Sequence, residues 1–104
     1  MSSSLSVVIP ALNEIELLPD NTQALLSLAC VDEVIVVDGG STDGTVEWLE
    51  QHSARQSKLS FTHSLPGRAL QMNAGAQIAK GDWLLFHHAD SALSGAGVQA
   101  IGEL

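Results

Sequence analysis

Two kinds of apolar segment alternate along this chain of 104 residues. Four short segments are rich in Val, Ile, Leu and aromatic residues, as buried strands are; they cover residues 5–9, 32–38, 58–64 and 82–88. Each is followed by a segment with apolar residues at helical spacing; these cover residues 13–29, 45–56, 67–81 and 94–104. Apolar strands that alternate with helices predict a parallel sheet covered on both faces. We therefore expect an α/β fold, a Rossmann-like three-layer α/β/α arrangement in the order β-α-β-α-β-α-β-α, with right-handed crossovers.

Two prolines and an asparagine set the expected ends of the first elements. Pro10 lacks a backbone N–H and is expected to stop the first strand at Ile9. Asn13 is a candidate N-cap for the helix that follows, because acidic residues occupy the positions of the first turn. Pro19 is expected either to end a first turn or to begin the main helix.

The third helix has a regular apolar pattern. Leu70, Ala74 and Ile78 are four residues apart, so they are expected to share the face that packs on the sheet. Gly81 is expected to be the C-cap of this helix. Trp83, near the start of the fourth strand, is expected in the core.

Composition places the chain among single globular domains. Apolar residues make up 45% of the chain, and we expect residues 1–104 to form one domain. The net charge is −8 with only four Lys and Arg residues, so a nucleic-acid partner is not expected. Cys30 is the lone cysteine, which excludes an intramolecular disulfide and a Cys-based zinc cluster. The sequence has no signal-peptide pattern and no membrane-spanning apolar run, so we expect a cytoplasmic location.

Polar, ionisable and glycine residues gather where the predicted strands end. The four clusters lie at residues 10–14, 38–45, 63–68 and 87–91. In open α/β sheets, ligands bind outside the carboxyl ends of the strands, and parallel strands bring those ends to one edge. We therefore expect a binding site that is built from these four clusters.

Asp38, at the end of the second strand, has two possible roles. A buried carboxylate needs hydrogen-bond partners, and at a strand end it could accept a hydrogen bond from a ligand. Alternatively, Asp38 caps its own loop while Asp43 begins the next helix. The chain has no G-x-G-x-x-G, no G-x-x-x-x-G-K-[ST] and no G-x-S-x-G, so dinucleotide, P-loop and serine-hydrolase chemistry are disfavoured.

Four sequence blocks together resemble the family 2 inverting glycosyltransferases of the GT-A fold. The blocks are SVVIPALNE, VIVVDGGSTDGT, LPGRALQMNAGA and WLLFHHADS, in the family's order and spacing. The last two resemble a poorly characterised bacterial subgroup. The resemblance implies the N-terminal, nucleotide-binding part of a GT-A fold, which takes a nucleoside-diphosphate sugar as donor. It also implies that the donor is contacted by Pro10, Ala11, Glu14, Asp38 and Arg68.

The fourth block departs from the family's Asp-x-Asp motif. The resemblance assigns Asp90 as a metal ligand and leaves Ala89 in the middle position, but His88 replaces the first aspartate. An oxygen-ligated divalent ion, Mg²⁺ or Mn²⁺, is the implied cofactor. His88 is a second candidate metal ligand, because imidazole suits manganese better than magnesium, or a hydrogen-bond partner of the donor. Strand alternation turns His87 away from His88, so we expect a structural role for His87.

The resemblance implies that the general base of an inverting transfer lies beyond Leu104. We therefore expect a donor-binding domain that is inactive as 104 residues alone. One alternative is a stand-alone nucleotide- or metal-binding module that associates with itself. A weaker alternative is a nucleotidyltransferase, which the acidic segment at residues 10–14 disfavours. Apolar residues on the last helix and on an incomplete sheet predict a homo-oligomer.

Overall fold

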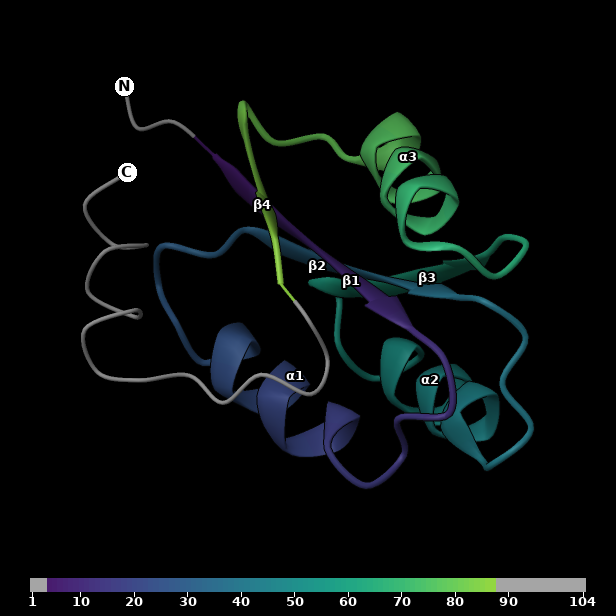
Figure 1. The fold of residues 1–104 in the computed structure, drawn as a ribbon. Coiled ribbons are helices and arrows are strands. Elements are labelled where there is room, and N and C mark those ends of the chain that lie inside the picture. Colours follow the sequence, from purple (N-terminus) through teal and green to yellow (C-terminus); the bar gives the residue numbers. More distant parts are fainter. Residues whose placement is uncertain (1–3, 88–104) are drawn as a thin grey trace.

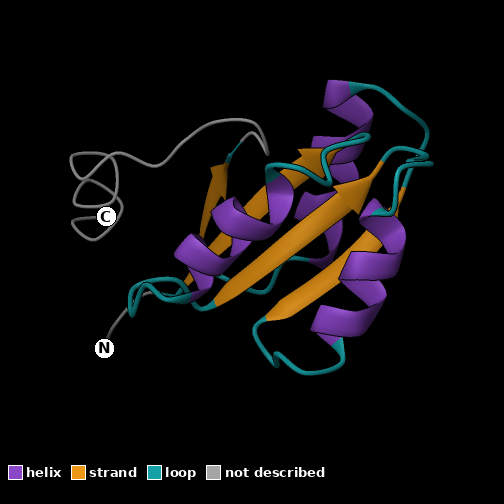
Figure 2. Ribbon diagram, turned by 90° about the horizontal axis from the view of Figure 1, so that it is seen from below, coloured by secondary structure: helices purple, strands orange, loops and turns teal. Residues whose placement is uncertain are grey.

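A four-stranded parallel sheet forms the centre of the protein, as a computed structural model shows for residues 4–87 (Figure 1). The strand order is β3-β2-β1-β4, and every pair of neighbours is parallel. The four arrows of Figure 2 point the same way. The elements are β1 (Leu5–Ala11), α1 (Leu18–Leu26), β2 (Glu33–Asp38), α2 (Thr45–Ser53), β3 (Leu59–His63), α3 (Arg68–Ile78) and β4 (Trp83–Phe86). The predicted α/β fold is confirmed over the described residues; the helix expected at residues 94–104 lies outside them.

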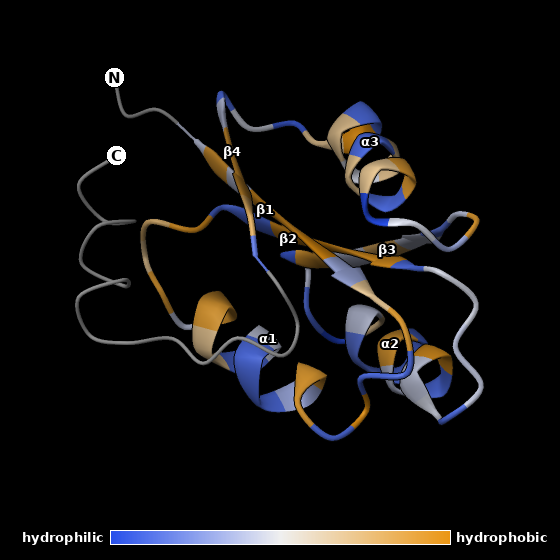
Figure 3. Ribbon diagram, viewed as in Figure 1, coloured by the Kyte–Doolittle hydropathy of each residue, from blue (hydrophilic) through white to orange (hydrophobic). Residues whose placement is uncertain are grey.

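The helices cover both faces of the sheet, α1 and α2 on one face and α3 on the other (Figure 1). The larger core lies under α1 and α2, where alternate residues of β1 and β2 meet Leu18, Leu25 and Leu49. The smaller core lies under α3 and contains Val8, Ile35 and Val37. Figure 3 shows the apolar residues concentrated in the central strands, whereas the helices carry both polar and apolar residues. Burial on both faces explains why β1 and β2 read as continuous apolar runs.

Pro10 does not end the first strand, contrary to expectation, because β1 continues to Ala11. Along a parallel strand, alternate residues direct their backbone groups to opposite neighbours. The carbonyl of Val8 accepts the N–H of His87, so Pro10, two residues on, faces the β4 side as well. The β1–β4 ladder ends at the pairing of Val8 with Phe86. Pro10 lies beyond this pairing, so its missing N–H removes no hydrogen bond between β1 and β4.

The predicted N-cap at Asn13 is wrong, because α1 begins only at Leu18. Asn13 has a positive φ of 53° and belongs to the loop. Pro19 lies in the first turn of α1, where a missing N–H costs nothing, so the second of the two expectations for this proline is confirmed.

The predicted inner face of α3 is confirmed only in part. Ala74 packs against the smaller core as expected. Leu70 and Ile78, however, are 53% and 43% exposed, and the buried residues of α3 are Gln71 and Gly75. Gly75 has no side chain, which lets α3 pack closely on Val8 and Val37, and the helix therefore turns this side, rather than the side of Leu70 and Ile78, toward the sheet. The helix ends with Ala79 as C-cap rather than Gly81.

Trp83 is 51% exposed on β4, not in the core as predicted. Within residues 4–87, β4 has only one neighbouring strand, so one side of it is uncovered. No helix in this part of the chain is long and apolar enough to cross a membrane. The cytoplasmic location stays a prediction.

Candidate functional site

Three strands end in one row at the carboxyl edge of the sheet. Ala11 of β1 is the register partner of Asp38 of β2, and Asp38 is the partner of His63 of β3. The N–H of Gly39 donates to the carbonyl of Ala11 at 2.9 Å, and the N–H of Ser64 donates to the carbonyl of Asp38 at 3.0 Å. Strand pairing thus brings together two of the predicted donor contacts, Ala11 and Asp38, and adds His63 beside them.

The Asp38 carboxylate is only 2% exposed and caps its own loop. Its Oδ2 accepts the N–H of Gly40 at 3.0 Å, and Oδ1 accepts the N–H of Ser41 at 3.2 Å. Burial raises the pKa of Asp38, but hydrogen bonds from the Ser41 hydroxyl, from these N–H groups and from His63 outweigh it, so the pKa is lowered. The carboxylate is therefore held ionised, and the predicted capping role is confirmed.

His63 is the exposed partner of this carboxylate. Its Nδ1 lies 3.4 Å from Oδ2 of Asp38, and its side chain is 60% exposed. Its ring packs edge-on against Phe61, with 5.6 Å between the ring centroids. Sequence reasoning assigned His63 no role, although its position at a strand end was a usable signal.

The loops after β1 and β2 are joined by side chains of Asn13 and Ser41. The N–H of Asn13 donates to Oγ of Ser41 at 2.9 Å, and Oδ1 of Asn13 accepts the N–H of Thr42 at 2.8 Å. The N–H of Ser41 in turn donates to the Asp38 carboxylate. Asn13 therefore links the first loop to the buried carboxylate, and its positive φ is part of that arrangement.

Asp43 makes a further link between the same loops. Its Oδ2 accepts the N–H of Ile15 at 3.1 Å, and its Oδ1 accepts both the N–H and the hydroxyl of Thr45. The hydroxyl of Thr45, first among several hydrogen bonds, lowers the pKa of Asp43. Asp43 was expected to begin the next helix; it lies just before α2, whose N-cap is Gly44, and accepts the N–H of the first helical residue, Thr45.

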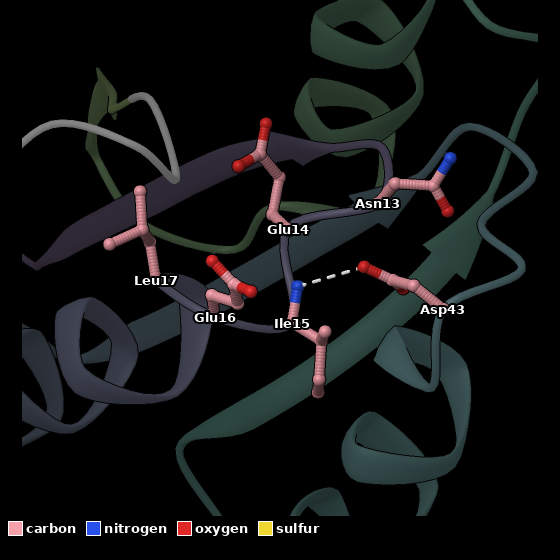
Figure 4. Close-up of a pocket in the computed structure, with 6 residues that line it drawn as sticks. All are labelled: Asn13, Glu14, Ile15, Glu16, Leu17 and Asp43. Carbon is pink, nitrogen blue, oxygen red and sulfur yellow. Dashed lines mark hydrogen bonds between the residues drawn. The ribbon is translucent and has the colours of Figure 1, made fainter.

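Glu14 lies in this joined loop pair and lines a cavity of about 430 Å³. Figure 4 shows Asp43 reaching the backbone of Ile15 while the Glu14 carboxylate is turned away from Asp43. The lining residues are Asn13, Glu14, Ile15, Glu16, Leu17 and Asp43. Three carboxylates make this cavity unsuitable for a bare anion. Asp38 is not among the residues that line this cavity.

Arg68 is the first residue of α3 and is exposed. The preceding residue, Gly67, has a φ of 144°, which favours glycine, and its N–H donates to Oε1 of Gln71 at 3.2 Å. Pro10, the remaining predicted contact in this part of the chain, is half-buried beside Val37 in the sheet.

His88, Ala89 and Asp90 lie outside the described residues. The last described residue is His87, which is half-buried and follows the end of β4. Within residues 4–87, no group of three or more His, Cys, Asp and Glu side chains is arranged to hold a metal ion. The predicted metal site therefore stays a prediction.

A family profile described as Glycosyl transferase family 2 matches residues 6–100. This match spans all four strand ends of the site. The chain belongs to glycosyl transferase family 2. The resemblance seen in the four sequence blocks is thereby confirmed.

Curated relatives in this family are longer than the chain. A PGL/p-HBAD biosynthesis glycosyltransferase of Mycobacterium bovis is 34% identical over 91 residues, which cover 85% of this chain and 36% of the relative. The uncharacterized glycosyltransferase YfnE of Bacillus subtilis is 39% identical over 89 residues, which cover 82% of this chain and 22% of the relative. The chain thus spans about a third or less of the length of these relatives.

Solved structures share the fold. The mannosyltransferase PcManGT of Pyrobaculum calidifontis, in complex with GDP-Man and Mn²⁺, has a TM-score of 0.81 at 24% identity over 97% of this chain and 31% of that one. Glucosyl-3-phosphoglycerate synthase of Mycobacterium tuberculosis, in complex with Mn²⁺, UDP and glucosyl-3-phosphoglycerate, has a TM-score of 0.70 at 27% identity over 86% of this chain and 34% of that one. Both likenesses confirm the GT-A type of sheet.

Proposed function

We propose that residues 1–104 form the donor-binding domain of a glycosyltransferase, which transfers a sugar with inversion from a nucleoside-diphosphate sugar to an acceptor. The observation that carries the proposal is the row of Ala11, Asp38 and His63 at the carboxyl edge of the sheet. This edge is where α/β folds bind ligands. The glucosyl-3-phosphoglycerate synthase complex, a relative at 27% identity, holds UDP and Mn²⁺.

Asp38 is the proposed contact to the nucleotide base. A carboxylate offers about four lone-pair positions, and the loop N–H groups occupy several of them. His63 is the most exposed partner, and its 3.4 Å separation from Asp38 is the longest of the contacts to this carboxylate. A base N–H that displaced His63 would replace a weak contact with a hydrogen bond to a charged acceptor. Because the carboxylate is already fixed by its loop, it would need little ordering on binding.

Pro10, Ala11, Glu14, Arg68, His88 and Ala89 are the other proposed donor contacts. Arg68 is the only one with a permanent positive charge, and its exposed place at the start of α3 suits a diphosphate. The acidic surroundings of Glu14 favour a cation between the protein and an anionic ligand.

We propose Mg²⁺ or Mn²⁺ as the cofactor, held by Asp90 with His88 as a candidate second ligand. Asp90 follows His87 by three residues in the sequence, and His87 is fixed beside β1 through its N–H. The carboxylate fits a hard divalent ion, whereas the described residues alone offer no complete ligand set. When bound, such an ion neutralises charge that develops on a leaving diphosphate.

Binding rather than turnover tests the proposal, because the chain spans about a third of its relatives. We expect UDP or GDP with Mn²⁺ to raise the melting temperature. At a hundredfold excess over Kd the stabilisation is about 2.7 kcal/mol. Asp90→Ala should abolish the metal-dependent part of this stabilisation. Asp20→Ala, the same substitution at an exposed position of α1, should leave it unchanged. The absence of a shift with either nucleotide would contradict the proposal.

Self-association is a second property that one observation favours. Trp83, Leu84 and Phe86 of β4 are 51%, 43% and 42% exposed, on a strand that has one neighbour among the described residues. Burial of these side chains in a homo-oligomer would remove apolar surface from water. Light scattering over a wide concentration range checks this, and a monomer at every concentration would contradict it.

A further inference from the structure

Gln71 is a buried amide on the sheet-facing side of α3, and it contacts three different segments. Its Nε2 donates to the carbonyl of Ala11 at 3.0 Å and to the carbonyl of Val37 at 2.9 Å. Its Oε1 accepts the N–H of Gly67 at 3.2 Å. The side chain is 5% exposed, so water does not replace these partners readily. One amide therefore joins the ends of β1 and β2 to the loop before α3.

Gly39 gives this amide its room. A Cβ added at Gly39 would lie 3.1 Å from Cδ and Nε2 of Gln71 and 3.2 Å from its Oε1. These distances are shorter than ordinary van der Waals contact. The amide thus packs flat against the backbone of Gly39, whose own N–H donates to the carbonyl of Ala11. A glycine and a glutamine that are distant in sequence form one unit.

We propose that Gln71 is a positioning residue, which fixes the spacing of the three loops that carry the donor contacts. Only the statement that these loops bind a sugar donor rests on the proposed function; the positioning of the loops does not. The positions it controls are Ala11, Asp38 through its neighbour Val37, and Arg68 through its neighbour Gly67. A leucine could fill the same volume, but it would remove the side-chain donor from the carbonyls of Ala11 and Val37 and the acceptor of the Gly67 N–H. The three hydrogen bonds, rather than burial, explain a glutamine at this place.

Gln71→Met tests the proposal, with Gln77→Met as the matched control on the exposed side of the same helix. The first measurement is amide hydrogen exchange in the absence of ligand. We expect exchange at Gly67 to become about tenfold faster in Gln71→Met, the factor that corresponds to its one lost hydrogen bond, and exchange at Gly39 to rise by a smaller factor, because its own bond to Ala11 remains. Amides in the middle of β2 should change no more than in Gln77→Met. Equal changes at the loops and in β2, or none at the loops, would overturn the proposal.

Gly39→Ala provides a variant that keeps the Gln71 side chain, in case Gln71→Met does not fold. We expect Gly39→Ala to speed exchange at Gly67 several-fold, because the new methyl group pushes on the amide. In a Gln71→Ala background the same change should have almost no further effect, because the crowded group is gone. Additive effects of the two substitutions would overturn the proposal.

Nucleotide affinity is the second measurement, and it separates this proposal from the proposed function. With UDP and Mn²⁺ as the probe, we expect Gln71→Met to raise Kd about tenfold while Gln77→Met leaves it unchanged. If the unmodified protein binds neither UDP nor GDP, the proposed function fails, and hydrogen exchange still decides whether Gln71 positions the loops. If it binds UDP and Gln71→Met binds equally well, the positioning role in donor binding is refuted.

Discussion

Gly75 lies where α3 closely approaches the sheet, and Gly75→Ala is predicted to destabilise the protein. A Cβ at this position would lie 2.4 Å from Cγ1 of Val8, 3.2 Å from its Cγ2 and 3.1 Å from Cγ2 of Val37. Favourable carbon–carbon contacts begin near 3.5 Å, so the helix and the strand would have to separate by about 1 Å. Val8 is fully buried in a central strand and its χ1 is stiff, which leaves little room to yield.

Two effects of opposite sign set the magnitude for Gly75→Ala. Alanine in place of glycine inside a helix stabilises by about 1 kcal/mol. Overpacking in a core costs about 1–3 kcal/mol, and a 2.4 Å contact belongs at the upper end of that range. The expected net loss is about 2 kcal/mol, which lowers the melting temperature by roughly 10 °C in a domain of this size.

Urea denaturation of Gly75→Ala measures this loss. Asn73→Ala, on the exposed side of the same helix, reports the helix-propensity effect alone and should be neutral or slightly stabilising. In a Val8→Ala background the cost of Gly75→Ala should largely disappear, because the facing methyl groups are absent. A Gly75→Ala protein as stable as the unmodified one would refute the close approach of α3 to the sheet.

Two further predictions concern buried polar groups. Asp38→Asn should lower the free energy of unfolding at pH 7 by about 1–3 kcal/mol, because an amide cannot accept all the loop hydrogen bonds. Since the native pKa of Asp38 is lowered, this difference in stability is full above the unfolded pKa of 3.8 and should shrink as pH falls through the native pKa. Urea denaturation at pH 7, 5 and 3 measures it, and a constant difference would contradict the prediction. Ser6→Ala should lower the free energy of unfolding by about 1–3 kcal/mol, because the buried Ser6 hydroxyl donates to Glu33 and accepts the N–H of Gly81. Ser60→Ala, at an exposed position of β3, should be close to neutral. Equal losses in thermal unfolding of the two variants would contradict this assignment.

The alternation of strands and helices was predictable because burial on both faces leaves a strong apolar signal. The strand-end rule likewise predicted where Ala11 and Asp38 would meet. Strand ends were less predictable: Pro10 continues a strand because the neighbouring ladder stops earlier, and that depends on a pairing the local sequence does not reveal.

Part of the inner face of α3 was mispredicted for a physical reason. Leu70 and Ile78 satisfy the usual apolar spacing, yet the helix lies too close to the sheet at Gly75 for a larger side chain at that position. Gln71 then falls on the buried side, four residues before it. The pair of a glycine and a long polar residue at that spacing is the signal that would have identified Gln71. Asn13 was predicted to cap the next helix, but its side chain accepts the N–H of Thr42, which is 29 residues away and which local sequence does not reveal.

The central claim is that a nucleoside diphosphate binds at the carboxyl edge of the sheet, and an NMR titration of the labelled protein with UDP and Mg²⁺ tests it most directly. The account predicts saturable amide shift changes concentrated at residues 10–14, 38–44 and 63–68, with little change at the opposite edge around Ser4, Glu33 and Lys80. Shift changes centred on that opposite edge, or no saturable change at any concentration of UDP, would contradict it.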